Sequence, residues 1–202
     1  MGDSAMERLT GLSRYSAAKP AVLRAEALSA FRIFGAVAAM VIAAHVRIPL
    51  PDTPVPMTLQ ALVVLLTGYL LPPLSAAVAM VLYLAMGAAG LPVFASTAGL
   101  SGLTGGYLMA FPAGAAVVSL LRGSFQASLP QLVWAGLCGM GVIFGIGLGW
   151  AAFQLGSVAA AAGAALLPFL PKALVEWALA VSAATLINGR RKSQERSRTV
   201  FS

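Results

Sequence analysis

Long apolar stretches, separated by short proline-rich or glycine-rich segments, make up most of the chain between two charged ends. The 69 residues between Asp52 and Arg122 include no Asp, Glu, Lys or Arg, and neither do the 49 residues between Arg122 and Lys172. A hydrocarbon core about 30 Å thick needs roughly 20 apolar helical residues per crossing. The pattern therefore predicts a polytopic membrane protein built from helices.

Proline, glycine and charged residues divide the apolar stretches into six expected helices. Proline and glycine within these stretches do not exclude a span, because neighbouring helices can satisfy the freed backbone groups. We therefore expect an all-α fold with six transmembrane helices, at residues 28–46, 58–71, 74–90, 106–121, 131–156 and 171–188.

The charges lie mainly at the two ends of the chain. Only 9% of the 202 residues are charged, 59% are hydrophobic, and the formal net charge is +7. Basic residues favour the cytoplasmic side of a membrane, so both ends are expected there, which requires an even number of spans. We expect residues 1–26 to form a cytoplasmic N-terminal tail, residues 27–189 the six-helix transmembrane domain, and residues 190–202 a basic cytoplasmic C-terminal tail. The loops after the first, third and fifth helices then face outward.

Several classes of protein are excluded by what the chain contains. One cysteine, Cys138, and one histidine, His45, cannot build a zinc site or a disulfide framework. No lysine follows a glycine as a phosphate-binding Walker loop requires. The basic residues flank membrane spans, which favours membrane orientation over nucleic-acid binding. We expect no metal, no cofactor and no nucleic-acid partner.

Lys172 and Glu176 are two charged residues in a region otherwise free of charge. Residues four apart share one face of a helix, and ionisable residues within a membrane usually face a cavity or a partner. Two interpretations stay open for this pair. The residues form a mutual ion pair near the interface, or Lys172 binds a substrate carboxylate while Glu176 accepts hydrogen bonds from substrate N–H groups.

Two outer segments could form the walls of an outward-facing pocket. Prolines at positions 49, 51, 54 and 56 predict an extended segment before the second helix. Thr58 is expected to cap that helix, and Gln60 can both donate and accept hydrogen bonds. Residues 90–107 form a long uncharged loop, and Thr104 is expected to cap the fourth helix with its hydroxyl. Either segment could instead be a structural connector.

A stripe of small residues lies along the first helix at four-residue spacing, at Gly35, Ala39 and Ala43. Small residues let two membrane helices approach closely. The stripe is therefore expected either to pack within the bundle or to dock a separate membrane subunit.

Three motifs in this order resemble the BioY family, the biotin-specific substrate-binding (S) components of energy-coupling factor (ECF) transporters. They are Val-Pro-Met-Thr-Leu-Gln at 55–60, Gly-Leu-Pro-Val-Phe at 90–94 and Thr-Gly-Gly-Tyr at 104–107. The likeness runs from about residue 48 to 111 and is weaker around 172–176. In this last region the family commonly has an acid followed one turn later by a lysine, whereas here the signs are reversed and shifted.

The resemblance implies a non-enzymatic, six-helix S component in a bacterial cytoplasmic membrane that captures biotin from outside. A transmembrane T component and paired ABC ATPases would then supply energy, and the stripe on the first helix would dock the T component. Residues in matching motifs are expected to bind biotin, with two aromatic side chains enclosing its thiophane ring: Gln60, Phe94, Thr104, Gly105 and Tyr107.

Burying the biotin carboxylate without a cation would cost several kcal/mol. Lys172 is the expected partner of the carboxylate, and Arg47 is second.

Three alternatives remain open at this point. The chain could be an S component for a different vitamin, or a structural membrane subunit. It also contains the Gly-x-Ser-Gly pattern of rhomboid intramembrane proteases at Gly99–Gly102, which would make Ser101 a nucleophile. A serine nucleophile needs a base within reach, but the chain's one histidine lies in the first helix and none follows Ser101.

Overall fold

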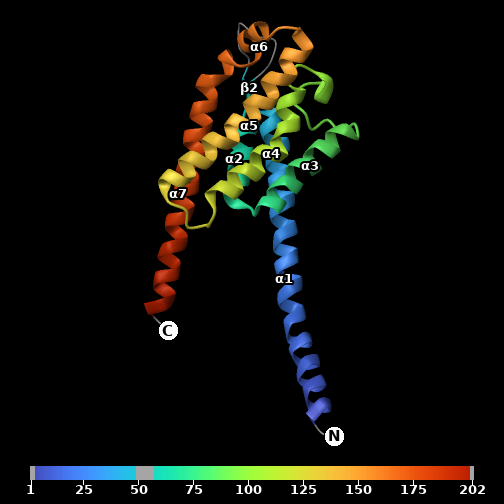
Figure 1. Ribbon diagram of the computed structural model, residues 1–202, viewed down its shortest axis with the longest axis vertical. Coiled ribbons are helices and arrows are strands. Elements are labelled where there is room, and N and C mark those ends of the chain that lie inside the picture. Colours follow the sequence, from blue (N-terminus) through green and yellow to red (C-terminus); the bar gives the residue numbers. More distant parts are fainter. Residues whose placement is uncertain (1–2, 49–56, 201–202) are drawn as a thin grey trace.

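The computed structural model describes residues 3–48 and 57–200, which fold into a bundle of helices (Figure 1). The strands found in these residues form one short antiparallel pair. The elements in chain order are α1 (Asp3–His45), β1 (Arg47–Ile48), β2 (Met57–Thr58), α2 (Gln60–Leu70), α3 (Pro73–Ala88), η1 (Gly99–Ser101), α4 (Gly105–Arg122), α5 (Leu129–Leu155), α6 (Val158–Ala165), η2 (Leu167–Phe169) and α7 (Leu170–Val200).

Four segments are long and apolar enough to cross a membrane: Leu23–His45, Gly105–Arg122, Leu129–Leu155 and Val158–Arg190. The apolar helices α2 and α3 have 11 and 16 residues. At 1.5 Å per residue they rise about 16 and 24 Å, less than the hydrocarbon thickness. The predicted all-helical membrane fold is confirmed, and the expected count of six crossings depends on these two short helices.

Both ends of the chain extend the helices next to them. The N-terminal tail is helical from Asp3 and continuous with the first apolar segment, and α7 continues through the C-terminal tail to Val200. The two termini lie at the same end of the bundle, and β2 and α6 lie at the opposite end (Figure 1). This arrangement fits an even number of crossings.

Between α5 and α7 the structure contains two additional short helices, α6 and η2, which the sequence pattern does not predict. Gly156 ends α5 in the left-handed conformation, and the Ser157 side chain then caps α6 by accepting a hydrogen bond from the Ala160 amide. Pro168 lies in the short helix η2. These breaks turn the chain back toward the bundle and place the start of α7 beside η2.

The strands β1 and β2 pair antiparallel, with Arg47 opposite Thr58 and Ile48 opposite Met57. The prediction that Thr58 caps α2 is wrong: the N-cap residue is Leu59, and no side chain caps the helix. Thr58 instead belongs to the strand pair, and its hydroxyl donates a hydrogen bond to the Gln60 side chain. The extended conformation predicted for the prolines concerns residues 49–56, which lie outside the described ranges.

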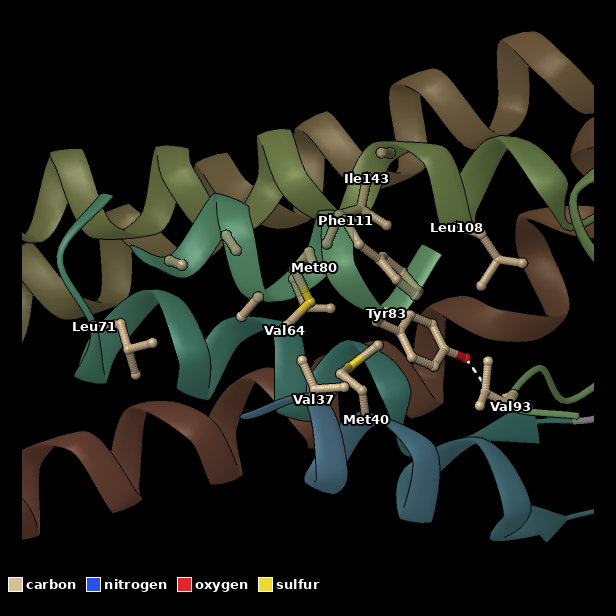
Figure 2. Close-up of a cluster of buried hydrophobic side chains, with 14 residues drawn as sticks. Val37, Met40, Val64, Leu71, Met80, Tyr83, Val93, Leu108, Phe111 and Ile143 are labelled. Carbon is tan, nitrogen blue, oxygen red and sulfur yellow. Dashed lines mark hydrogen bonds between the residues drawn. The ribbon is translucent and has the colours of Figure 1, made fainter. Parts of the chain in front are cut away.

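The largest cluster of buried apolar side chains joins α1, α2, α3 and α4 and includes Ile143 of α5 (Figure 2). Met40 from α1 and Met80 from α3 are fully buried, and so is the ring of Tyr83. A second cluster joins α2, α4, α5 and α7. The middle of α2 is packed on two sides, because Val64 belongs to the first cluster and the next residue, Leu65, to the second.

Glycines let α4 and α5 approach closely. A Cβ atom at Gly139 would lie 2.3 Å from Val118 Cγ2, and one at Gly114 would lie 2.6 Å from Ile143 Cγ1. One at Gly147 would lie 2.5 Å from the ring of Tyr107. Small residues are the usual means of close packing between membrane helices, and here they also fix the position of the Tyr107 ring.

Adding a methyl group to α5 tests this close packing. Gly139→Ala should destabilise the protein by roughly 1–3 kcal/mol, because the methyl group overpacks the contact with α4. The matched control is Gly145→Ala on the same helix, where a Cβ has no neighbour within 4 Å and alanine favours the helix by about 1 kcal/mol. Thermal unfolding in detergent should show a lower midpoint for Gly139→Ala than for Gly145→Ala. Equal midpoints would contradict the close packing of these helices.

Candidate functional site

A cavity of about 110 Å³ lies among the first turns of α2, α4 and α7 and the segment that joins α3 to α4. These parts of the chain belong to the end of the bundle opposite the termini (Figure 1). The wall of the cavity is mostly apolar, with a few polar side chains. It is lined by Thr58, Gln60, Ala61, Ala95, Ser96, Gly99, Thr104, Tyr107, Leu108, Phe111, Ile143, Phe144, Ala165, Phe169, Lys172, Ala173 and Glu176.

Aromatic side chains from three elements form much of the apolar wall. Tyr107 and Phe144 pack edge to face, with ring centroids 5.6 Å apart and planes at 84°. The Tyr107 hydroxyl donates a hydrogen bond to the Ala165 carbonyl at the end of α6. This bond holds the ring in the wall between α4, α5 and α6. Such a wall suits an apolar ring system better than a charged group.

The polar side of the cavity contains the charged pair that the sequence places on one helical face. Lys172 Nζ lies 2.8 Å from Glu176 Oε2, and the side chains are 17% and 3% exposed. Oε1 of Glu176 is buried and has no hydrogen-bond partner within residues 3–48 and 57–200, although the backbone amide of Leu62 faces the carboxylate. A buried acceptor without a partner is costly, so this oxygen can accept a hydrogen bond from a ligand.

Gln60 is the first residue of α2 and belongs to a chain of hydrogen bonds across the bundle. Thr58 Oγ1 donates to Gln60 Oε1 (2.9 Å), and Gln60 Nε2 donates to the Tyr83 hydroxyl (2.8 Å). Tyr83 in turn donates to the backbone carbonyl of Val93 (3.0 Å). The chain connects β2, α2, α3 and the segment that follows α3.

Five of the residues predicted from the sequence come together in the cavity wall: Gln60, Thr104, Tyr107, Lys172 and Glu176. Thr104 is the N-cap residue of α4, but its side chain makes no capping hydrogen bond. The prediction of a capping hydroxyl is therefore wrong, and the hydroxyl remains available in the wall of the cavity.

The other three predicted binding residues lie outside the cavity lining. Phe94 packs against Tyr83, with ring centroids 5.4 Å apart and planes at 79°. Gly105 is buried where a Cβ atom would lie 1.9 Å from the Leu100 carbonyl oxygen, so its role in the structure is close backbone packing. Arg47 is exposed in β1.

The small residues of the stripe on α1 become more buried from Gly35 to Ala43. Gly35 is exposed, and a Cβ atom there would have no neighbour within 4 Å. Ala39 is half-buried and Ala43 is buried. The three residues therefore do not form one exposed face.

Several cavity residues were not predicted from the sequence, among them Phe111, Phe144 and Phe169. The segment after α3 is also fastened by side chains of α5: Trp150 donates to the Gly102 carbonyl (3.0 Å) and Gln154 to the Ser101 carbonyl (2.8 Å). A tryptophan or glutamine in an otherwise apolar helix indicates that its N–H group has a hydrogen-bond partner, but the sequence does not identify that partner.

The residues of the protease alternative make local hydrogen bonds. The Ser101 hydroxyl donates to the Ala98 carbonyl (2.8 Å), and His45 Nδ1 lies 2.8 Å from the Val41 carbonyl oxygen, which accepts a hydrogen bond from it. Within the described part of the chain, no three His, Cys, Asp or Glu side chains form a group that could hold a metal ion.

Comparison with known proteins gives consistent results. The BioY family model matches residues 17–193. The biotin transporter BioY of Thermotoga maritima is 36% identical over 137 residues, which cover 66% of this chain and 79% of that protein. The probable biotin transporter BioY of Pyrococcus horikoshii is 36% identical over 141 residues, covering 67% and 82%. The crystal structure of the S-component for biotin from an ECF-type ABC transporter superposes with a TM-score of 0.73 at 21% identity, covering 82% of this chain and 93% of that one. This last likeness confirms the predicted fold.

Removing one charge of the buried pair should cost more stability than removing both. Lys172→Met leaves Glu176 buried without its cation, which should destabilise the protein by roughly 3 kcal/mol. The double variant Lys172→Met/Glu176→Gln buries no net charge and should be within about 1 kcal/mol of the parent protein. The free energy of unfolding of the two variants and the parent protein would be measured in the same detergent. A double variant less stable than Lys172→Met would contradict the interpretation that Glu176 depends on Lys172 as its buried counter-ion.

Proposed function

This chain belongs to the BioY family, as its motifs predict, and we propose on that premise that it takes up biotin across a membrane as a biotin-binding S component. Its relatives are transporters, and its role is binding and translocation without covalent chemistry. The observation that carries the proposal is the cavity, where an aromatic wall faces Gln60, Lys172 and Glu176. Biotin combines an apolar ring with a ureido group and a carboxylate, so it needs both sides of such a site.

The ureido group of biotin binds at the polar side, next to the first turn of α2. Its N–H groups donate to Oε1 of Gln60 and to Oε1 of Glu176. Two facts support this assignment: both residues line the cavity, and the Glu176 oxygen has no other partner among the described residues. A ligand that supplies this hydrogen bond removes the cost of an unsatisfied buried acceptor.

The biotin carboxylate pairs with Lys172. An ammonium group has three donors, and one of them is used for Glu176, so further donors remain for a ligand. Arg47, which is exposed in β1, is the second cation. In the family the acid usually precedes the lysine, whereas here the lysine comes first. The reversed order still supplies one cation for the biotin carboxylate and one acceptor for an N–H group.

The thiophane ring lies against the aromatic wall. Tyr107 contacts it directly, together with Phe144 and Phe169. Phe94 supports the site from behind through its contact with Tyr83. Thr104 supplies a hydroxyl, and Gly105 keeps the start of α4 close to the preceding segment.

The chain works in a bacterial cytoplasmic membrane with both termini in the cytoplasm, and with a T component and ABC ATPases as partners. The termini lie at one end of the bundle and the cavity-lining elements at the other (Figure 1), so biotin enters from outside. Docking of the T component uses α1 around Gly35, with Ala39 beside it, whereas Ala43 packs inside the bundle. Exposed apolar side chains on the same helix, such as Phe31 at 77% exposure, face lipid or the partner.

A binding comparison tests the carboxylate assignment without leaving Glu176 as a buried anion that has lost its cation. The parent for this test is Glu176→Gln, which keeps an acceptor at that position, and the variant is Lys172→Met/Glu176→Gln. Relative to this parent, the variant should lose at least about tenfold in affinity for biotin, which corresponds to 1.4 kcal/mol, and much less for biotinamide. Equal losses for the two ligands would assign the carboxylate to another residue.

Ser101→Ala is the control that separates a transporter from a protease. The Ser101 hydroxyl bonds to its own turn and is not part of the cavity lining. Biotin binding should survive the change, and loss of binding would contradict the passive role assigned to this serine. An S component for a different vitamin would bind that vitamin in preference to biotin in the same assay.

A further inference from the structure

The hydrogen bonds around Tyr83 can run in only one direction. The Val93 carbonyl can only accept, so the Tyr83 hydroxyl must use its single proton to donate to it. The hydroxyl oxygen is then left to accept, and it accepts from Gln60 Nε2. The backbone carbonyl thus determines which end of the Gln60 amide faces Tyr83.

The same constraint determines what Gln60 presents to the cavity. With Nε2 directed to Tyr83, Oε1 lies on the other side, where it accepts from Thr58. Both Thr58 and Gln60 line the cavity, and an amide oxygen has a second lone pair. A ligand group that meets Gln60 through Oε1 must therefore be a hydrogen-bond donor.

Tyr83 cannot act by touching the ligand itself. Its side chain is fully buried, it is not among the cavity-lining residues, and its ring lies among the core side chains with its hydroxyl toward Val93 (Figure 2). Any effect of Tyr83 on binding must pass through Gln60 or through the segment that contains Val93.

We propose that Tyr83 is a positioning residue: together with the Val93 carbonyl it fixes the Gln60 amide with its oxygen toward the cavity, so that the site selects an N–H donor there. That this donor is the ureido group rests on the proposed function, whereas the orientation of Gln60 does not. Without the Tyr83 hydroxyl, the terminal amide can turn over and present its NH₂ group. Two donors would then face each other, and ligand affinity would fall.

The first experiment measures biotin affinity in Tyr83→Phe, which removes the hydroxyl and keeps the ring. The matched control is Tyr69→Phe: Tyr69 is also buried, and its hydroxyl also donates to a backbone carbonyl, that of Leu132 (2.6 Å), away from the cavity lining. Tyr83→Phe should bind biotin about tenfold more weakly than the parent protein, and Tyr69→Phe should bind with unchanged affinity. An unchanged affinity in Tyr83→Phe would overturn the proposal.

A double-variant cycle separates positioning from general damage to the fold. If Tyr83 acts through Gln60, then Tyr83→Phe/Gln60→Ala should bind biotin as well as Gln60→Ala alone, because the residue being positioned is already absent. A purely structural role would reduce affinity by the same factor in both backgrounds. Such additivity would overturn the proposal.

A measurement on the ligand-free protein makes the orientation testable independently of biotin. In protein labelled with ¹⁵N-glutamine, the Gln60 side-chain amide protons should show a nuclear Overhauser effect to the Tyr83 ring in the parent protein, which needs no variant to fold. Their resonances should also shift in Tyr83→Phe and not in Tyr69→Phe. If the parent fails to bind biotin but shows this contact, the proposed function fails and the orientation stands. If the contact is absent, the orientation is wrong whatever the ligand.

Discussion

A carboxylate buried inside a helical bundle is the constraint on which the binding end of this protein depends. Glu176 is 2% exposed, and a lone charge at such a place would be prohibitively costly. Lys172, one turn earlier on α7, supplies the cation. The four-residue spacing on α7 forms the pair, and because α7 follows directly after η2, its first two turns bring both side chains into the wall of the cavity. One oxygen of the carboxylate is bound by Lys172, and the other has no hydrogen-bond partner among the described residues.

The remaining polar groups of the site follow the same rule that a buried donor or acceptor needs a partner. Gln60 is satisfied by Thr58 and Tyr83, and Tyr83 by the carbonyl of Val93. Around this network the fold is held by apolar packing, and Gly147 of α5 packs against the ring of Tyr107 in the aromatic wall. The cavity is thus bounded by packed apolar side chains on one side and by hydrogen-bonded polar side chains on the other.

The sequence pattern predicts the parts of this structure that depend on local rules. Apolar length gives the helices, four-residue spacing gives the Lys172–Glu176 pair, and motif resemblance brings Gln60, Thr104 and Tyr107 into one wall. The sequence pattern does not predict contacts between segments that are far apart in the chain. Thr58 is drawn into a strand pair instead of a cap, and the role of Tyr83 depends on a carbonyl ten residues away. The phenylalanines of the wall look like any other core residues until the helices are placed.

The most direct test of the central claim is a calorimetric titration of biotin into the detergent-purified chain, without other subunits. The account predicts a one-to-one complex of nanomolar affinity, because the site is complete within this chain: cation, acceptors and aromatic wall all line one cavity. No detectable binding at micromolar biotin, in protein shown to be folded, would contradict it.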